Sequence, residues 1–514
     1  MLSRVYSSGL VGIDGFEVTV ECSSWNRIPK FELVGLPDAA VKEAKNRVQS
    51  ACENSGLKFP SLDVMVNLAP ADVKKEGSAF DLAILTAVLH SGGVIPHSCD
   101  LSDKCLLGEL SLSGEVRPIG GVLPMVVSAR DRGRREVFVP YDNRGEAAVV
   151  DGINVYGVKS FRQFYEHIRG GERITPEIHD KSVFENNYNK NCPDFSDVRG
   201  QYKAKRALEI AAAGGHNVLM IGPPGAGKSM LAKRIPSILP DMSFSEAIET
   251  TKVHSVMGVL KGNLVNARPF RAPHHTATPA GFVGGGAAAR PGEISLAHNG
   301  VLFLDELPEF PKSITEALRQ PLEDGVVTVT RAAAKISYPS TFMLVAAMNP
   351  CRCGFYGDET RQCTCTPAMI QKYLSKVSGP LLDRIDIQIE LPAVSFDEIS
   401  GKSAAGEPSD KIRERVNAAR RFTNERLVRG GDEPGLLNAN MTPEVLHKYC
   451  KPTEEGVELM REAFDSLGLS ARGHDKVLRV ARTIADLDGA EVINDTHIAE
   501  AIMYRSLDRK YWNR

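Results

Sequence analysis

The chain has 514 residues, of which 42% are hydrophobic and 25% are charged. This is the composition of a globular protein, and so long a chain exceeds one hydrophobic core, so we expect about two to four domains. The formal net charge is −2, so no general positive field attracts nucleic acid, and binding to DNA would need local basic patches. We find no signal-peptide core and no run of about 18 apolar residues, so we expect a cytoplasmic protein without a membrane span.

Residues 1–170 are predicted to form an N-terminal domain of mixed α and β structure. Alternation of apolar and polar residues predicts strands, and apolar residues recurring on one face predict helices. The predicted strands cover residues 16–22, 63–68 and 136–140, and the predicted helices cover 38–54 and 80–89.

Two segments of this region, 74–81 and 108–121, resemble the proteolytic domain of Lon-type proteases. The resemblance implies the α+β fold of that domain, which is of the ribosomal S5 domain 2-like kind. It also places Ala79 where Lon has its catalytic serine and Leu123 where Lon has its catalytic lysine. Ser78 is shifted by one position, which should aim its side chain elsewhere. A serine–lysine dyad needs both groups, so we predict a Lon-like domain without proteolytic activity.

Residues 171–195 are polar and rich in asparagine, so we predict a linker there. The apolar strands and helices that follow predict an α/β core with a parallel sheet over residues 196–395. The last region, 396–514, shows only helical patterns after a polar stretch, and we predict an all-helical C-terminal domain. The chain should therefore contain three domains and one linker.

A phosphate-binding loop is predicted between an apolar run at 218–221 and a helical pattern at 230–238, because a strand, a glycine-rich loop and a helix occur in this order. The loop reads Gly222-Pro223-Pro224-Gly225-Ala226-Gly227-Lys228-Ser229. Glycines let backbone N–H groups wrap round a polyphosphate, and a helix N-terminus favours negative charge. We predict that Lys228 binds the β- and γ-phosphates of ATP and that Ser229 holds Mg²⁺.

Two further strands are predicted to end in polar side chains. The run 301–304 is followed by Asp305 and Glu306, and the run 342–347 leads to Asn349. The carboxyl ends of parallel strands meet at one edge of an open sheet, where such sheets bind their ligands. We predict that Asp305 joins the Mg²⁺ shell, that Glu306 polarises the attacking water and that Asn349 contacts the γ-phosphate or the water. The alternative is that these side chains are ordinary turn residues.

Arg384 lies between apolar residues just before a predicted strand at 385–390. One interpretation is a structural ion pair with Asp383 or Asp386. The other is an arginine finger that reaches the γ-phosphate of a neighbouring subunit, because a guanidinium meets the charge on a transferring phosphoryl group well.

Four cysteines follow Asn349 in one loop, and they are Cys351, Cys353, Cys363 and Cys365. Four thiolates can hold Zn²⁺ in a tetrahedral structural site. The C-x-C spacing is tighter than the common C-x₂-C, so reduced thiols or a redox-labile pair stay open as alternatives.

The segments 270–278, 290–298 and 378–386, together with the motifs above, resemble the AAA+ ATPases of the magnesium-chelatase-like branch. With the Lon-like domain, the chain is similar to the YifB/ComM family along essentially its full length. The resemblance implies a ring, expected to be a hexamer, and a helicase-like motor that moves DNA with ATP and Mg²⁺. Members of the ComM type are associated with branch migration during natural transformation.

The family pattern also assigns roles outside the nucleotide motifs. It implies that Arg472, near the start of a predicted helix at 471–486, is a sensor that contacts the γ-phosphate, with Arg479 as the second choice. Alternation predicts a β-hairpin at 326–338, and related helicases place such a hairpin in the central pore. Arg331 and Lys335 near its tip are expected to contact DNA phosphates, the alternative being a solvated tip with no ligand.

Three other functions remain open from the sequence. The first is a magnesium-insertion motor for tetrapyrroles, although the chain lacks the acidic, proline-rich and integrin-like extension of the partner subunit. The second is an ATP-dependent protease, which Ala79 and Leu123 argue against. The third is a scaffold ATPase that assembles partners without moving DNA.

Overall fold

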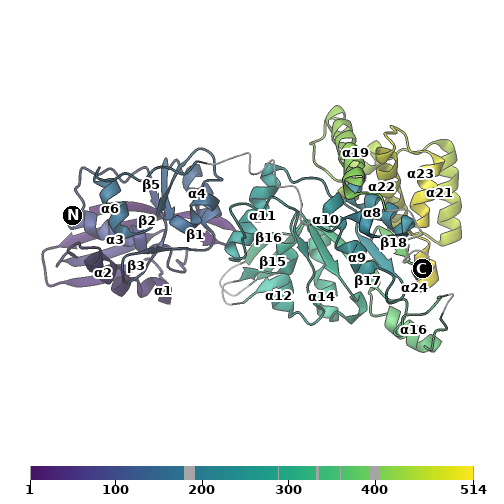
Figure 1. Ribbon diagram of the computed structural model, residues 1–514, viewed down its shortest axis with the longest axis horizontal. Helices are drawn as coiled ribbons and strands as arrows, with labels where there is room; N and C mark the ends of the chain where they lie inside the picture. Colours follow the sequence, from purple (N-terminus) through teal and green to yellow (C-terminus); the bar gives the residue numbers. More distant parts are fainter. Residues whose placement is uncertain are drawn as a thin grey trace. The chain divides into compact units, whose positions relative to one another are not determined.

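The structure is a computed structural model that describes residues 2–178, 192–286, 289–330, 335–358, 361–393 and 406–512. The chain divides into two compact units (Figure 1). Unit 1 comprises Met1–Asn186 and Phe244–Asn266, and unit 2 comprises Asn187–Ser243 and Ala267–Arg514. Within the described ranges, no helix is long and apolar enough to cross a membrane.

Unit 1 is built on a seven-stranded sheet with the strand order β3-β4-β2-β1-β5-β8-β9. The strands are β1 (Leu2–Val11), β2 (Asp14–Trp25), β3 (Lys30–Val34), β4 (Asp63–Ala69), β5 (Lys104–Leu106), β8 (Glu136–Pro140) and β9 (Asn154–Val158), with a separate pair β6 (Glu109–Leu110) and β7 (Val116–Arg117). The pairs β1–β2 and β2–β4 are antiparallel, whereas β3–β4, β1–β5, β5–β8 and β8–β9 are parallel. This mixed sheet confirms the predicted α+β character of the N-terminal region.

The helices of unit 1 that come from the N-terminal region are α1 (Ala39–Lys42), α2 (Ala44–Asn54), α3 (Asp81–Ser91), α4 (Val122–Asp131), α5 (Arg144–Ala147) and α6 (Phe161–Ile168). The helix predicted at 38–54 is divided at Glu43 into α1 and α2. α3 is buried along almost its whole length, including Asp81. Arg47 of α2 donates two hydrogen bonds to the Asp81 carboxylate, at 2.8 and 3.0 Å, so this buried charge is paired and joins the two helices.

Unit 1 also contains α11 (Phe244–Val256), a helix from the stretch between the phosphate-loop region and the rest of unit 2. It contacts α4, and Gly121 donates its backbone N–H to the carbonyl of Ser255 at 3.2 Å. The Ser255 hydroxyl donates to the buried Glu146 carboxylate, and Ile248 and Leu264 pack on the apolar cluster beneath. Burial raises the pKa of Glu146, although hydrogen bonds from its neighbours oppose this shift. No local sequence pattern had predicted this packing.

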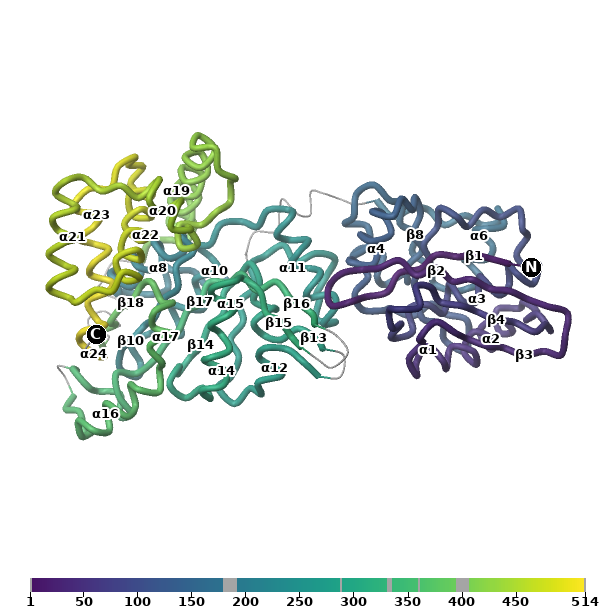
Figure 2. Tube along the Cα trace, turned by 180° about the vertical axis from the view of Figure 1, so that it is seen from behind, coloured from purple at the N-terminus to yellow at the C-terminus, as the bar shows by residue number. Residues whose placement is uncertain are grey.

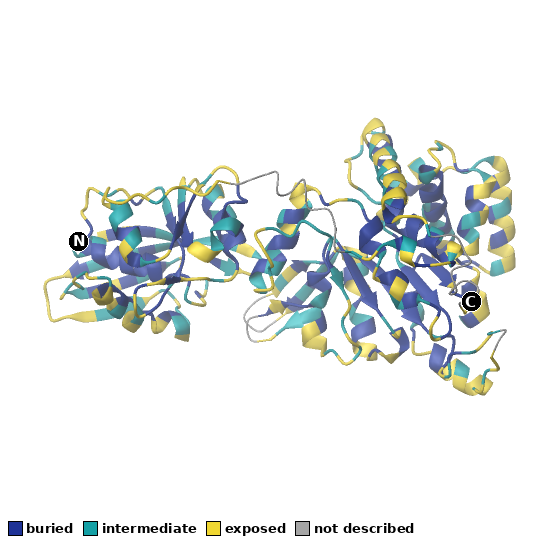
Figure 3. Cartoon of the chain, in the orientation of Figure 1, coloured by how far each residue is buried: buried dark blue, intermediate teal, exposed yellow. Residues whose placement is uncertain are grey.

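Unit 2 contains a five-stranded parallel sheet with the order β11-β14-β17-β10-β18. The strands are β10 (Val218–Ile221), β11 (Phe270–Arg271), β14 (Val301–Leu304), β17 (Met343–Met348) and β18 (Ile387–Glu390). Every residue of β10, β14 and β17 is buried, as Figure 3 shows in dark blue. Parallel sheets are covered on both faces, which explains why these strands read as unbroken apolar runs. The predicted parallel α/β core is confirmed.

The helices around this sheet are α8 (Tyr202–Gly214), α9 (Lys228–Ala232), α10 (Ile235–Ile238), α12 (Pro279–Val283), α13 (Glu293–Leu296), α14 (Lys312–Ala317), α15 (Arg319–Asp324), α16 (Pro367–Leu374) and α17 (Gly379–Leu382). The helix predicted at 230–238 is divided into α9 and α10, because Pro236 lacks the N–H that would continue the helical ladder. Two small antiparallel pairs are β12 (Gly284–Gly285) with β13 (Arg290–Pro291), and β15 (Val326–Thr330) with β16 (Lys335–Pro339).

The C-terminal part of unit 2 is helical, as predicted (Figure 2). Its helices are α19 (Ser409–Arg429), α20 (Pro443–Tyr449), α21 (Glu454–Leu467), α22 (Ala471–Leu487), α23 (Asp495–Met503) and α24 (Leu507–Trp512). Thr442, Thr453 and Ser470 cap three of them by accepting a backbone N–H three residues on. Such caps satisfy N–H groups that have no partner within the helix, so the sequence marks these helix starts clearly.

A buried polar network joins α22 to the sheet of unit 2. The Asp386 carboxylate lies 3.4 Å from the Lys476 amine, and Lys476 also donates to the Ile385 carbonyl at 2.9 Å. His216 lies 3.5 Å from Asp386 on one side and bonds Thr483 of α22 at 2.8 Å on the other. Burial lowers the pKa of Lys476 to about 8. Burial would raise the pKa of Asp386, but this effect is outweighed by Lys476, His216 and a backbone N–H, which hold the pKa well below its usual range. Both groups are therefore charged at neutral pH.

We expect Asp386→Asn to destabilise unit 2 by about 3 kcal/mol at pH 7, because it leaves the Lys476 charge buried without its partner. The folded pKa of Asp386 is lowered, so its contribution is present above about pH 4, the unfolded value, and is lost as the pH falls below it. Urea unfolding in a Trp25→Phe background, followed by Trp512 fluorescence, measures unit 2 alone. When the pH is lowered from 7 to below 4, the free energy of unfolding should fall less in the variant than in the parent. An equal fall in both proteins would contradict the stabilising role of the Asp386 carboxylate.

Candidate nucleotide-binding and hydrolysis site

The predicted phosphate loop follows β10 and leads into α9. Gly225 and Gly227 have φ angles of +82° and +89°, and no atom lies within 4 Å of the place a Cβ would occupy at either residue. Gly222 is required for a different reason, because a Cβ there would lie 2.5 Å from the Leu391 carbonyl oxygen. The loop thus combines left-handed backbone with one close approach to a neighbouring strand end, and only glycine meets both conditions.

Lys228 is held at the carboxyl edge of the sheet by three hydrogen bonds. Its amine donates to the carbonyl oxygens of Gly222 at 2.6 Å and Pro223 at 2.9 Å, and to Oδ1 of Asn349 at 3.1 Å. Burial lowers its pKa to about 8, although Asp305 and Glu306 act in the opposite direction. The amine is thus a partly desolvated cation, which is suited to binding a polyphosphate.

Ser229 and Asp305 form the second link across this edge. The Ser229 hydroxyl donates to Oδ2 of Asp305 at 2.6 Å. A hydroxyl beside a carboxylate supplies the oxygen ligands that Mg²⁺ prefers, and a bound Mg²⁺ would take the place of this hydrogen bond. The structure thus brings together Lys228, Ser229, Asp305 and Asn349, as the sequence predicted. These residues follow the carboxyl ends of β10, β14 and β17, and β17 lies between the other two strands.

Glu306 has an unusual backbone for a non-glycine residue, with φ +53° and ψ +49°. Such a left-handed conformation costs about 1 kcal/mol or more and often marks a functional position. The Glu306 side chain is 57% exposed, and one of its carboxylate oxygens lies 3.8 Å from Nδ1 of His275. An exposed carboxylate next to Asp305 is placed to polarise water, and His275 is a neighbour that local sequence pattern did not predict.

Arg384 is placed differently from the four converging residues. Its side chain is only 9% exposed, its guanidinium pairs with Glu323 of α15, and it also donates to the Pro380 carbonyl at 2.5 Å. The structural alternative is an ion pair of Arg384 with Asp383 or Asp386, but the structure shows Glu323 as its partner. The arginine-finger role stays a prediction, and it would require Arg384 to leave Glu323.

The two candidate sensor arginines differ in their surroundings. Arg472, in the first turn of α22, is exposed, and within the described ranges it forms no hydrogen bond or ion pair. Arg479, further along α22, donates to the Met441 carbonyl at 2.8 Å and is half-buried. Arg472 is therefore free to meet a ligand, whereas Arg479 contributes to packing within the helical region.

The β15–β16 hairpin forms as predicted, with Thr330 opposite Lys335. Lys335 is exposed near its tip. Arg331 lies outside the described residues, so only Lys335 can be placed. A DNA contact at this hairpin stays a prediction.

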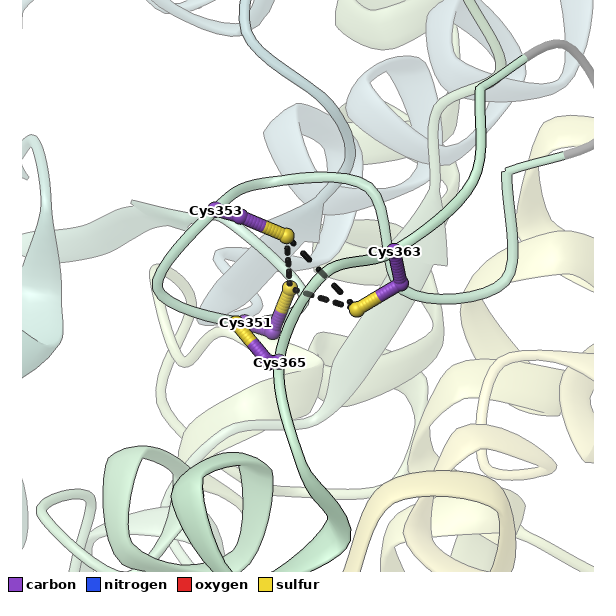
Figure 4. A group of neighbouring side chains, drawn as sticks. All are labelled: Cys351, Cys353, Cys363 and Cys365. Carbon is purple, nitrogen blue, oxygen red and sulfur yellow. Dashed lines mark hydrogen bonds between the residues drawn. The ribbon is translucent and has the colours of Figure 1, made fainter.

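The four clustered cysteines converge in the loop after β17 (Figure 4). The ligand atoms of Cys351, Cys353, Cys363 and Cys365 all lie within 4.8 Å of one another. Burial raises the pKa of the Cys353 thiol, but backbone N–H groups of Phe355 and Thr364 donate to its sulfur and the net effect lowers the pKa. The cluster is compatible with a metal ion.

The Lon-like region carries no serine–lysine dyad at the matched positions. Ala79 and Leu123 are both buried in one apolar cluster of unit 1. Ser78 points its hydroxyl to the Glu109 carboxylate instead. The two positions that the Lon resemblance matches to a nucleophile and a base therefore lie in packed hydrophobic core.

A parallel sheet, a phosphate loop and an acidic pair at neighbouring strand ends define an AAA+ type P-loop ATPase. Three family models match the chain: magnesium chelatase, subunit ChlI, at residues 194–399; subunit ChlI of Mg-chelatase at 19–143; and the ChlI C-terminal region at 406–505. The chain therefore belongs to the magnesium-chelatase-type AAA+ ATPases.

Full-length relatives show that, among these ATPases, the chain belongs to the YifB/ComM family. Competence protein ComM of Haemophilus influenzae is 42% identical over 99% of this chain and 98% of its own length. The uncharacterized protein YifB of Escherichia coli is 41% identical over the same shares of the two chains. Lon protease 2 of Bacillus subtilis is 28% identical over 149 residues, which are 27% of this chain and 26% of that protein.

We expect Glu306→Gln to keep ATP binding and to lower ATP turnover by about 100-fold or more, because only the activation of water is lost. Fluorescent-nucleotide binding and phosphate release measure the two effects separately. Glu309→Gln is the matched control, because Glu309 is a nearby acid that pairs with Lys376 on the surface. Turnover that falls equally in both variants would contradict the role of Glu306.

Proposed function

We propose that the chain is the subunit of an ATP-driven ring, expected to be a hexamer, that moves branched DNA such as recombination intermediates. The observation that supports it most is the assembled set of Lys228, Ser229, Asp305 and Asn349 in a chain that matches a competence protein along almost its full length. ATP and Mg²⁺ are the cofactors of this proposal, which does not depend on a metal at the four cysteines.

In this proposal each part of the site has one task. Lys228 and the loop amides bind the phosphates, Ser229 and Asp305 hold Mg²⁺, and Glu306 activates water. Asn349, whose oxygen now accepts a hydrogen bond from Lys228, contacts the γ-phosphate or the water when ATP is bound. Closure of the helical region onto the nucleotide then brings Arg472 to the γ-phosphate of its own subunit.

Arg384 completes the site of the neighbouring subunit. The pair with Glu323 holds the guanidinium within its own subunit, and release from it would make the arginine available across a ring interface. Hydrolysis would then depend on assembly, which is a property expected of a ring motor. The exposed Lys335 on the β15–β16 hairpin is the described basic residue that we propose to contact DNA phosphates.

The test is ATP turnover with no DNA, single-stranded DNA, duplex DNA and a four-way junction, with Glu306→Gln as the control for contaminating ATPases. A motor of branched DNA should turn over ATP fastest on the junction, and the stimulation should fall steeply with salt, because phosphate contacts release counterions. Turnover that no DNA changes would count against the motor and favour the scaffold function.

A second function has a specific observation in its favour, since the family models are named for a magnesium chelatase subunit. A magnesium-insertion motor would respond to a tetrapyrrole and partner subunits rather than to DNA. The protease alternative predicts ATP-dependent loss of casein that disappears in Ser78→Ala. The packed core around Ala79 and Leu123 leads us to expect no casein cleavage at all.

A neighbouring-subunit role for Arg384 makes a prediction about mixtures of two inactive variants. Arg384→Ala should keep ATP binding and lose turnover by about 1,000-fold, and Glu306→Gln should keep binding and lose turnover by about 100-fold or more. When Arg384→Ala and Glu306→Gln subunits are mixed, some interfaces combine an intact Glu306 with an intact Arg384. Turnover should then reappear, and its dependence on the mixing ratio measures the effect.

The control is a mixture of Arg384→Ala with an Arg384→Ala, Glu306→Gln double variant, in which no intact interface can form. Recovery in this control, or full turnover by Arg384→Ala alone, would rule out an arginine finger here. Failure to recover in mixed rings whose formation is shown by native mass spectrometry would place Arg384 in its own subunit.

A further inference from the structure

The four-cysteine loop is the densest group of metal-binding side chains that the described part of the chain contains, and the proposed motor does not use it. Three sulfur–sulfur distances are 3.3 Å for Cys351–Cys353, 3.7 Å for Cys351–Cys363 and 3.6 Å for Cys353–Cys363. A tetrahedral zinc site with Zn–S bonds of about 2.3 Å has sulfurs about 3.8 Å apart. A disulfide would need about 2.05 Å, so these three sulfurs have the spacing of a shared ion and not of a covalent pair, and the Cys365 sulfur lies within 4.8 Å of each of them.

The backbone of the loop is also arranged to support thiolates. The N–H groups of Phe355 and Thr364 donate to the Cys353 sulfur. The N–H of Cys365 donates to the Cys363 sulfur, and the N–H of Cys353 donates to the Cys365 sulfur. Hydrogen bonds from backbone N–H groups to a cysteine sulfur are contacts that orient a thiolate ligand toward a metal.

The same loop touches the nucleotide site at two places. Cys351, which is fully buried, lies two residues after Asn349, the side chain that accepts a hydrogen bond from Lys228. Gly354, with φ +88°, lies against Pro224 of the phosphate loop, and a Cβ at Gly354 would lie 2.5 Å from the proline Cδ. The cysteine loop therefore packs directly on the phosphate loop while it continues the strand that ends in Asn349.

We propose that the four cysteines bind one Zn²⁺ in a tetrahedral thiolate site, and that this ion fixes the loop that holds Asn349 and supports Pro224. The metal has no role in the chemistry of hydrolysis. It is a structural ion whose loss loosens two contacts of the nucleotide site. The link to hydrolysis rests on the proposed ATPase function, whereas the metal site itself does not.

The first experiment measures metal in the full chain purified without chelators. We expect about one zinc per chain by mass spectrometry of the metal, and less than a tenth as much iron, which is the other ion that four thiolates select. Cys353→Ser and Cys365→Ser should each lose most of the zinc. Cys99→Ser is the matched control, because Cys99 is a partly buried free cysteine of unit 1, and it should keep the zinc.

A second measurement keeps the test valid if the serine variants fold poorly. Growth of the unaltered chain with Co²⁺ in place of zinc should give the strong visible absorption and the sulfur-to-metal charge-transfer bands of a tetrahedral thiolate site. A chain that carries no metal and gives no such spectrum, or one whose zinc survives both serine substitutions, would overturn the proposal. Stoichiometric iron with a cluster spectrum would overturn the assignment to zinc.

Gly354→Ala tests the contact between the cysteine loop and the phosphate loop without removing any of the four cysteines. The new methyl group would press on Pro224, and the left-handed backbone disfavours alanine, while all four sulfurs remain. We expect about one zinc per chain but turnover at least about fivefold lower. Unchanged turnover in this variant would contradict the link between the cysteine loop and hydrolysis. A chain that binds zinc but shows no DNA stimulation would count against the proposed motor function and not against the zinc site.

Discussion

The site depends on one constraint, the order of strands in the sheet of unit 2. β17 lies between β10 and β14, so the residue after each strand end meets the others at one edge. The bonds Lys228–Asn349 and Ser229–Asp305 join the three strand ends directly. An order that placed more strands between β10 and β14 would keep Lys228 and Ser229 away from Asn349 and Asp305, whatever the local motifs. This edge of the sheet also carries the glycines of the phosphate loop, Glu306 with its left-handed backbone, and the cysteine loop after β17.

Two positions of unit 1, which the Lon resemblance matches to a catalytic serine and lysine, have a packing role in this chain. Ala79 and Leu123 are packed in the same apolar cluster that supports α11. α11 lies in the sequence between two parts of unit 2, but it packs within unit 1 through Ser255, Glu146 and Ile248. Ala79 and Leu123 therefore contribute to the apolar cluster on which Ile248 of α11 packs.

Much of the fold could be predicted from sequence because its signals are local. The unbroken apolar runs of β10, β14 and β17 reflect strands covered on both faces, and Thr442, Thr453 and Ser470 mark helix starts by their side-chain caps. The motifs around Lys228 and Asp305 predicted the site for the same reason. Pro236 explains the break between α9 and α10, because a proline interrupts the helical hydrogen bonds although the apolar pattern at 230–238 continues across it.

The features that the sequence did not predict depend on contacts between residues far apart in the chain. β11 has only two residues, which is too short for a periodic pattern. Glu323 as the partner of Arg384, His275 beside Glu306 and the packing of α11 in unit 1 all follow from tertiary structure. The cysteines lie between these cases, since their spacing suggested a metal but only their convergence in space supports one.

The most direct test of the account follows the branch point of a synthetic four-way junction, labelled with two fluorophores, while the chain consumes ATP. Energy transfer between the labels reports the position of the branch in single molecules. The account predicts directed movement that needs ATP, stops with ADP and is absent with Glu306→Gln. A branch point that stays in place while the chain hydrolyses ATP would contradict the central claim that hydrolysis at the edge of this sheet moves branched DNA.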